Sequence, residues 1–285
     1  MYDWPPVAGI DLHTHTTYSD GTFTPAEAVA HAVQIELDVL GLTDHDSTEG
    51  VAEARAAADG TDLEIVPGVE FSTVYEHGGV HMLTYWPDLE NADFQAELTR
   101  LREDRWTRGE RMVRNLQDLG YPILFERVQE LASGKNIGRP HVAQALVEAG
   151  VVSELKQAFS KELIGTGGRA YVEKHALHPL DAVTLMKRAQ GLAVVAHPLH
   201  WRDGLPVPDD LIERLVDVGL DGIECAHPDH DPSTEGRYRD LAKRLGLVAT
   251  GSSDCHGRRY NPVRMGSKTT DPEEFAKMKE RRGPA

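Results

Sequence analysis

With 285 residues, of which 40% are hydrophobic, the chain is long enough for one large α/β barrel or two modest domains. Its formal net charge of −16 excludes long nucleic acid as a partner of the general surface, because the phosphates would be repelled. No apolar run reaches membrane length, no signal peptide is recognisable, and Cys225 and Cys255 lack the spacing of a disulfide framework. We therefore expect a cytoplasmic protein that does not bind membranes.

The first predicted element is a strand that begins at Val7 and runs into Asp11, His13 and His15. Because side chains alternate along a strand, these three side chains would project to the same side. Two imidazoles on one face can bind a single divalent ion. A lone His-x-His pair is common in proteins, so the remaining histidines and carboxylates decide the interpretation.

Strands and helices then alternate up to about residue 87. The segment Thr24-Pro25-Ala26-Glu27 predicts the start of a helix with a capping box, and a second helix is expected over Val51 to Ala58. Further strands are expected at 37–42, at 63–71 and, after a turn at Gly78-Gly79, at 80–84. Side chains of the metal-binding type lie in or just after these strands: His45, Glu70 and His81.

Between residues 88 and 168 the pattern changes to helical periodicity without a recognisable strand. Apolar residues between Phe94 and Leu119 predict one long helix, and Pro140 starts a shorter helix that ends near Gly150. We interpret 88–168 as a helical insertion that stands over the barrel mouth.

The alternation resumes after the insertion. Helices are expected over 179–190, 209–218 and 233–245, each followed by a strand, at 192–196, 222–225 and 247–250, and a last helix starts at Asp271. The first of these strands ends at His197, and the last leads to Asp254 and His256. We count seven parallel-type strands, which predicts an α/β barrel over 1–87 and 169–285 with its site at the carboxyl ends of the strands.

Residues of the metal-binding type therefore accumulate at strand ends. A single histidine is more often an ordinary core or surface group, but burying many titratable groups together without cations would be very unfavourable. Imidazoles and carboxylates without a thiolate suit manganese, iron or zinc better than magnesium or calcium. The complete set is His13, His15, Asp20, His45, Glu70, His81, His197, Asp254 and His256.

Most of these residues lie in the motifs His13-x-His15, Thr43-Asp44-His45, Gly68-x-Glu70, Ala196-His197-Pro198 and Gly251-Ser252-Ser253-Asp254-x-His256-Gly257. In this order, the motifs resemble those of the polymerase-and-histidinol-phosphatase (PHP) domain family. The resemblance implies a distorted seven-stranded (β/α) barrel that holds two or three divalent metals. It also implies three ligand groups and a catalytic set. The implied ligand groups are His13, His15, Glu70 and Asp254 for one metal; Glu70, His81 and His197 for a second; and Asp20, His45 and His256 for a third. The implied catalytic residues are His13, His15, Glu70, His197 and Asp254.

Two more aspartates adjoin these motifs. Asp11 and Asp44 either orient ligand imidazoles or are polar strand ends that bind backbone groups. Cys255 lies between two predicted ligands, and strand alternation points it away from the metals, so we interpret it as structural.

Closely spaced metals suit hydrolysis of a phosphate ester. They lower the pKa of a bridging water, which becomes hydroxide near neutral pH, and they neutralise charge on the phosphoryl oxygens. An amidase could use the same ions, but the arginines described next favour a phosphate ester over an amide as the substrate. Arg139 precedes Pro140 at a helix start, a natural anion site. Arg105 and Arg108 lie on the apolar stripe of the long helix. Their side chains therefore either cover the apolar surface with the charged group reaching solvent, or point into a water-filled cleft.

Three further residues complete the set expected to bind substrate: Lys135, His141 and His227. The proton donor for the leaving group is expected among His141, His227 and His230.

The Arg139-Pro140-His141 element narrows the resemblance to PHP enzymes that act on nucleotides. The expected reaction is hydrolysis of a 3′,5′-nucleoside bisphosphate to the 5′-monophosphate, an AMP-like product, by a metal-bridged hydroxide. The alternatives are a phosphodiesterase or 5′-3′ exonuclease on short 5′-phosphorylated RNA, a phosphatase of another small metabolite such as histidinol phosphate, and a metal-stabilised binding module without catalysis. No protein partner is indicated.

Overall fold

The computed structural model describes residues 9–76, 78–132, 136–174, 176–199 and 205–282. Val7, where the first strand was expected to begin, and Lys135 lie outside the described residues. No helix in these ranges has the length and apolar character needed to span a membrane. The cytoplasmic location stays a prediction.

Seven strands form one sheet in chain order. Its first and last strands approach each other through a parallel bridge between Thr14 and Cys255, where the His15 amide donates to the Cys255 carbonyl at 2.8 Å. The sheet is therefore a nearly closed barrel, which confirms the expected distorted seven-stranded fold. The strands are β1 (Ile10–Thr14), β2 (Val39–Leu42), β3 (Glu64–Tyr75), β4 (Gly78–Tyr85), β5 (Leu192–Val195), β6 (Gly222–Ala226) and β7 (Val248–Gly251).

The prediction of seven parallel strands is wrong for β4. This strand runs antiparallel to both β3 and β5, while the remaining neighbours pair in parallel. The reason is the short connection: β3 extends to Tyr75 and the chain returns at once, so that Gly78 pairs with Tyr75. Such a tight turn can join only antiparallel strands. Gly78 and Gly79 accordingly belong to β4 itself and not to the turn.

The reversed direction of β4 determines where His81 lies. His81 is in the first half of its strand, opposite Ser72 of β3. Its carbonyl accepts a hydrogen bond of 3.0 Å from the Ala196 amide, directly before His197. His81 thus reaches the barrel end at which the parallel strands finish.

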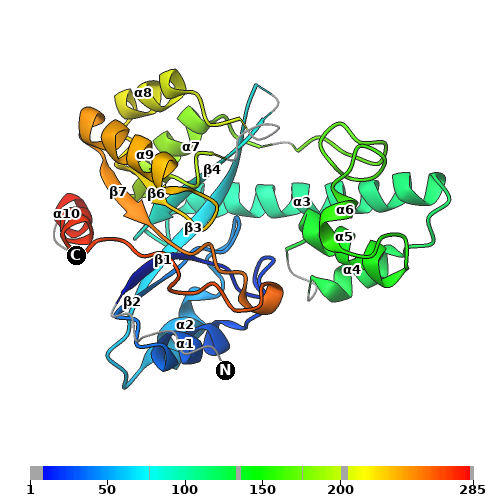
Figure 1. The fold of residues 1–285 in the computed structure, drawn as a ribbon, viewed down its shortest axis with the longest axis horizontal. Helices are drawn as coiled ribbons and strands as arrows, with labels where there is room; N and C mark the ends of the chain where they lie inside the picture. Colours follow the sequence, from blue (N-terminus) through cyan, green and yellow to red (C-terminus); the bar gives the residue numbers. More distant parts are fainter. Residues whose placement is uncertain (1–8, 77, 133–135, 175, 200–204, 283–285) are drawn as a thin grey trace.

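In the described part of the chain, six helices belong to the barrel and lie around its strands (Figure 1). The capping box predicted at the first of them is present, because the Thr24 hydroxyl accepts from the Glu27 amide and the Glu27 carboxylate accepts from the Thr24 amide. The helices are α1 (Pro25–Gln34), α2 (Val51–Ala58), α7 (Pro179–Arg188), α8 (Asp209–Asp217), α9 (Pro232–Leu245) and α10 (Pro272–Arg282).

The segment predicted to be an insertion is helical. Among its described residues there are four helices and no strand: α3 (Ala92–Asp118), α4 (Phe125–Leu131), α5 (Arg139–Glu148) and α6 (Leu155–Ala158). The sequence did not predict α4 and α6, because segments of 7 and 4 residues carry too few apolar positions to show a helical period. The exact boundaries, 88 and 168, stay a prediction.

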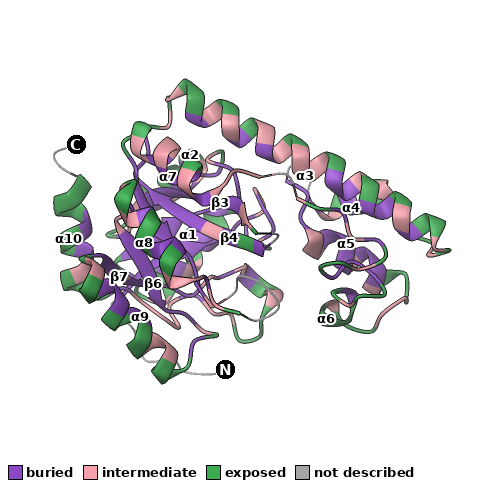
Figure 2. Cartoon of the chain, turned by 90° about the horizontal axis from the view of Figure 1, so that it is seen from above, coloured by how far each residue is buried: buried purple, intermediate pink, exposed green. Residues whose placement is uncertain are grey.

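The long helix α3 joins the two parts of the chain. Figures 1 and 2 show it running from the barrel to the insertion, and Figure 2 shows that most of the strand residues are buried. Phe94 and Leu98 near its start pack into a core cluster of the barrel. Met112 and Leu116 further along pack into a separate cluster of the insertion. Because one helix belongs to both cores, it fixes the intervening segment, including Arg105 and Arg108, between barrel and insertion.

Candidate metal centre

All nine residues predicted to bind metals converge at one end of the barrel. Each group below offers ligand atoms that lie within 4.8 Å of one another. The groups overlap in His13, His15, His45 and Glu70, so they form one continuous cluster. They are His15, Asp20, His45 and His256; His13, His15 and Asp254; His13, Glu70 and His197; and His45, Glu70 and His81.

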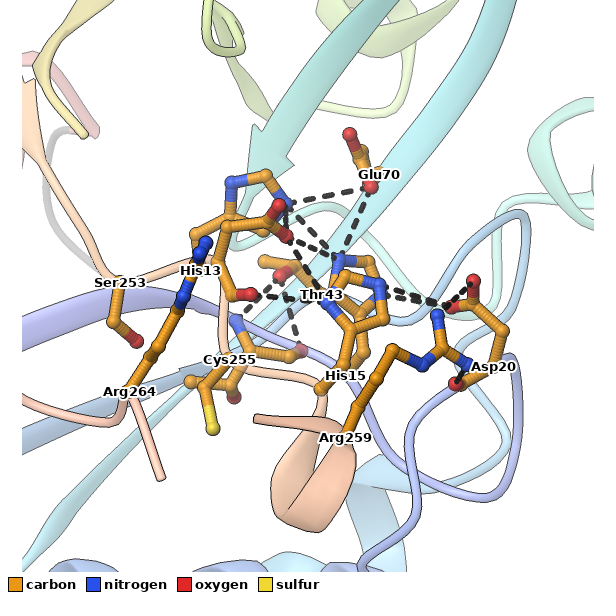
Figure 3. A network of polar contacts seen from close by, with 12 residues as sticks. His13, His15, Asp20, Thr43, Glu70, Ser253, Cys255, Arg259 and Arg264 are labelled. Atoms are coloured by element: carbon orange, nitrogen blue, oxygen red, sulfur yellow. Dashed lines mark hydrogen bonds and ion pairs between the residues drawn. The ribbon is translucent and has the colours of Figure 1, made fainter. Parts of the chain in front are cut away.

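Glu70 of β3 is the centre of this cluster, and Figure 3 shows its carboxylate facing His13 and His15. Burial alone would raise the pKa of its carboxyl, but the surrounding histidines, His45 and His81 foremost, hold that pKa well below its usual range. A single carboxylate surrounded in this way is suited to be a ligand shared between ions. Within 3.3 Å of its two oxygens lie ring nitrogens of five histidines: His13, His15, His45, His81 and His197.

The neighbours of the first two histidines assign their protons. His13 Nδ1 lies 3.2 Å from the Glu224 carboxylate, which can only accept, so Nδ1 carries the hydrogen. Ser19 donates its hydroxyl proton to Asp44 at 2.5 Å, so its oxygen accepts from His15 Nδ1 at 3.4 Å. In the neutral form of both rings, the Nε2 atoms would therefore carry lone pairs, and these atoms face each other at 3.1 Å. A cation between them relieves this repulsion, which is the arrangement of a metal-binding pair.

Charge in the cluster favours cations for a second reason. Burial disfavours a charged His15 imidazole, yet the Asp254 and Glu70 carboxylates outweigh burial and raise the pKa of His15 to about 10. The site thus attracts positive charge strongly at the Nε2 atom, and divalent ions would supply that charge.

Asp20 is the carboxylate of the third group. Its Oδ1 lies 3.2 Å from His256 Nε2 and 3.9 Å from His45 Nε2. Arg259 donates to the Asp20 carbonyl and lies 3.5 Å from Oδ2, as Figure 3 shows. Burial opposes ionisation of Asp20, but His256, His45 and Arg259 hold its pKa well below the usual range.

Unsatisfied polar atoms show that this residue set fits divalent ions. Within the described chain, buried Asp20 Oδ1, His45 Nδ1, His81 Nδ1 and Asp254 Oδ1 have no hydrogen-bond partner. The two imidazole atoms lie 2.9 and 2.7 Å from Glu70 oxygens without hydrogen-bond alignment. Buried polar atoms normally have partners, because each one without a partner costs about 1–3 kcal/mol. Coordination of ions would satisfy all of them together.

Backbone strain occurs at two of the predicted ligands. His197 after β5 and Asp254 after β7 have positive φ angles of 21° and 48°. This conformation is uncommon for residues other than glycine and persists where the surrounding structure enforces it. The strained turns direct both side chains into the cluster.

Asp11 and Asp44 support the cluster in different ways. Asp11 accepts from the Ser253 amide at 3.0 Å, from the Ser253 hydroxyl at 2.5 Å and from the Gly266 amide at 2.9 Å. It therefore holds the loop before Asp254 instead of orienting an imidazole. Asp44 does orient an imidazole, that of His15, through Ser19. Cys255 is buried, as expected for a structural residue.

Glu224 is a functional residue that the sequence analysis missed. It is fully buried in β6, lies 3.2 Å from His13 Nδ1 and accepts from the His197 amide at 2.7 Å. One carboxylate thereby orients a predicted ligand and the strained backbone of another. The available signal was a charged residue in the middle of an otherwise apolar strand, Gly222–Ala226.

A pocket of about 380 Å³ opens over the metal cluster. Its barrel wall includes His45, His81 and His197, and its insertion wall includes Arg108 and Arg139. Arg105 and Lys174 also line it, the latter missed by the sequence analysis because nothing in its local pattern distinguishes it. The structure thus places the insertion arginines across a pocket from the predicted ligands.

These cations differ in how they are held. Arg105 pairs with Asp46 at 2.6 Å, and Arg108 donates to the Val172 carbonyl at 2.7 Å. Arg139 stacks 5.6 Å from the ring centre of Phe159, and among the described residues it has no carboxylate within 4.0 Å. Arg139 is therefore the arginine of this wall that is most available to an anion.

The cations also repel one another. Burial and the neighbouring Arg139 lower the pKa of Arg108 to about 10, and burial together with Arg105 lowers that of Lys174 well below its usual range. A negatively charged ligand bound among these side chains would reduce their mutual repulsion, so this part of the pocket favours anions.

Three predicted histidines lie apart from this wall. His141 accepts from the Gly138 amide at 3.0 Å and lines a different cavity, and burial lowers its pKa to about 4. His227 lies 3.6 Å from Asp254 and so adjoins the cluster. His230 lies 2.8 Å from the Cys225 carbonyl.

Comparison with known proteins identifies the family. The PHP domain profile matches residues 11–177. The chain belongs to the PHP domain family. It is 34% identical over 251 residues to the 3′,5′-nucleoside bisphosphate phosphatase of Chromobacterium violaceum, and the aligned region covers 88% of each protein. It is 32% identical over 248 residues to the 5′-3′ exoribonuclease Rnm of Escherichia coli, covering 86% of this chain and 84% of that one.

A solved structure supports the same family assignment. The chain matches the proposed metal-dependent phosphoesterase of Bifidobacterium adolescentis with a TM-score of 0.90 and 32% identity over 98% of both chains. This PHP protein is accordingly a metal-dependent phosphoric ester hydrolase, as the sequence predicted.

The first prediction concerns the shared carboxylate. Glu70→Gln keeps the size of the side chain but removes the charge at the centre of the cluster. We expect at least about a hundredfold loss of phosphate release and fewer bound ions per chain, measured by elemental analysis after dialysis. Near-normal turnover with unchanged metal content would contradict the shared role of Glu70.

The second prediction concerns Glu224. Its replacement by glutamine leaves only one acceptor oxygen for His13 Nδ1 and the His197 amide. We expect metal affinity or turnover to fall by about 10–100-fold while the protein remains folded. Glu213→Gln, on the exposed face of α8 where Glu213 pairs with Arg244, is the matched control and should behave as wild type. Equal behaviour of both variants would refute the orienting role.

Proposed function

We propose that this PHP enzyme hydrolyses the 3′-phosphate of a 3′,5′-nucleoside bisphosphate and releases the nucleoside 5′-monophosphate, an AMP-like product. The observation that carries this proposal is the cationic lining of the pocket, in which Arg108 and Arg139 of the insertion and Lys174 of the segment after it line the same pocket as the predicted metal ligands. The pocket thus offers two separate places for negative charge. The name of the Chromobacterium violaceum relative supports the same substrate class.

A substrate with one phosphate would use only half of this pocket. If the metal cluster holds the phosphate to be cleaved, Arg139 has no acidic partner among the described residues, and Arg108 and Lys174 repel each other and Arg139. A second phosphate on the same nucleotide would pair with these cations through charge-assisted hydrogen bonds. Two phosphates therefore satisfy both walls of the pocket.

The protein residues have distinct roles in this proposal. Ions held by the cluster would supply an activated water and neutralise charge on the phosphoryl oxygens, and the imidazole-rich set suits manganese, iron or zinc. We propose His13, His15, Glu70, His197 and Asp254 as the residues at the centre of that chemistry.

The remaining roles belong to the supporting residues. Glu224 holds His13 and the His197 backbone in place. Arg139 and Lys174 would bind the remote 5′-phosphate, and this binding energy positions the 3′-phosphate for attack.

A third prediction tests the second phosphate. Wild-type protein should hydrolyse a 3′,5′-bisphosphonucleoside with a higher kcat/KM than the nucleoside 3′-monophosphate, which carries the same scissile group. Arg139→Ala should reduce this preference by about tenfold or more, because one charge-assisted hydrogen-bond donor is lost.

Arg114→Ala is the control, since Arg114 is exposed on the same insertion and pairs with Glu110. The control should keep the wild-type preference. A wild-type protein that treats both substrates alike, or an Arg139 variant with an unchanged ratio, would disprove the proposed function.

A further inference from the structure

The turn at His45 and Asp46 carries a predicted metal ligand of the barrel. His45 follows β2 and takes part in two of the four ligand groups, one with Asp20 and one with Glu70. The next residue, Asp46, is fully buried and has a positive φ of 52°, which is uncommon for residues other than glycine. Such a conformation persists where neighbouring groups enforce it. The contacts of this turn therefore determine where the His45 imidazole lies.

Three side chains of the insertion bind this turn. Asn136, in the segment before α5, donates an amide hydrogen to the His45 carbonyl. Arg102 of α3 donates to the Asp46 carbonyl at 2.9 Å. About one turn further along the same helix, Arg105 Nε donates to the Asp46 carboxylate at 2.6 Å. Both backbone carbonyls of the turn and its carboxylate are thus bound by residues between 88 and 168.

On the barrel side, the same turn is joined to the centre of the metal cluster. The Asp46 amide donates to the Glu70 carbonyl at 3.1 Å, and the Asp46 carboxylate accepts from the Ser72 amide at 2.8 Å. Arg105 also donates to the Ser72 hydroxyl at 2.5 Å, and Ser72 lies opposite His81 in the sheet. Arg105 therefore connects α3 to two segments that carry predicted ligands.

These contacts leave Arg105 little freedom to bind a substrate anion, the role expected for it from the sequence. Its side chain is 11% exposed, and two of its nitrogens already donate to Asp46 and Ser72. Removing one partner of a buried ion pair leaves the other charge uncompensated, so Arg105 and Asp46 depend on each other. Arg105 is therefore better placed to fix the turn than to hold a phosphate.

We infer that Arg105 and Asn136 are positioning residues for the ion of one ligand group, and that the insertion thereby completes a metal site whose ligands all come from the barrel. This group comprises His15, Asp20, His45 and His256. Without either contact, the turn would be free to leave its strained conformation, and the His45 imidazole would shift relative to the Asp20 carboxylate. Metal sites tolerate only small changes in ligand position, so the ion would bind more weakly.

The other predicted ligands are held from within the barrel. Glu224 of β6 lies 3.2 Å from His13 Nδ1 and accepts from the His197 amide at 2.7 Å. Loss of the insertion contacts should therefore weaken one ion selectively. The inference concerns how the metal centre is completed, and it does not depend on which phosphate ester is the substrate.

The test measures manganese binding to the purified full-length protein without nucleotide. Ions per chain are counted by elemental analysis after dialysis against a series of manganese concentrations, and the Tm of each variant is recorded. Arg105→Ala and Asn136→Ala should each weaken the binding of one ion by about 10–100-fold and leave the other ions bound as in wild type. Arg105→Lys keeps the charge and one contact, so it should recover part of the affinity.

The direction of the change is informative. Arg105→Ala removes a positive charge near the cluster, and this effect alone would strengthen the binding of a cation. A weaker ion in this variant is therefore the result expected from lost positioning and opposite to that expected from charge. Arg100→Ala is the matched control, because Arg100 lies on the same helix and pairs with Glu97, and it should bind manganese as wild type does.

The outcomes decide the inference independently of the proposed function. Selective loss of one ion in both insertion variants, with partial recovery in Arg105→Lys, would support it. Unchanged or tighter manganese binding in both variants would overturn it, whichever substrate the enzyme prefers. Loss of all ions together with a lower Tm would also overturn it, because the contacts would then stabilise the whole fold and not one site.

Discussion

The structure depends on a single buried carboxylate surrounded by imidazoles. Glu70 lies in the interior of β3, and its oxygens lie within 3.3 Å of ring nitrogens from five histidines that come from β1, β4 and the segments after β1, β2 and β5. Burying such a group is unfavourable unless cations complete it. The remaining architecture serves to bring these side chains together, and the strained turns at His197 and Asp254 show that the chain departs from relaxed geometry to do so.

The pocket over this cluster requires two departures from a regular barrel. The first is the hairpin of β3 and β4, which reverses one strand and so brings His81 beside Glu70 at 2.7 Å. The second is the long helix α3, which packs into both hydrophobic cores and holds the insertion at a fixed place across from the metal cluster. Cationic side chains and predicted metal ligands therefore line the same pocket.

The nine residues that converge in the structure could be singled out from the sequence because their signal is local. Most are histidines or carboxylates at or after the end of a strand, and the barrel brings strand ends together, whereas Glu70 and His81 lie within β3 and β4. The direction of β4 was missed although only two residues separate Tyr75 from Gly78, a length that already favours a hairpin. Glu224 and Lys174 were missed for a different reason, since their roles come from what faces them across the fold. Likewise, Asp11 and Asp44 look alike in sequence, and only their partners, Ser253 and Ser19, distinguish them.

The central claim is that the cluster around Glu70 is one multinuclear metal centre. The most direct measurement is anomalous scattering from crystals of the enzyme prepared with manganese, recorded above and below the manganese absorption edge. The account predicts at least two anomalous peaks within the cluster, with Glu70 in contact with two of them. A single peak, or peaks that lie outside the nine residues in catalytically active protein, would contradict it.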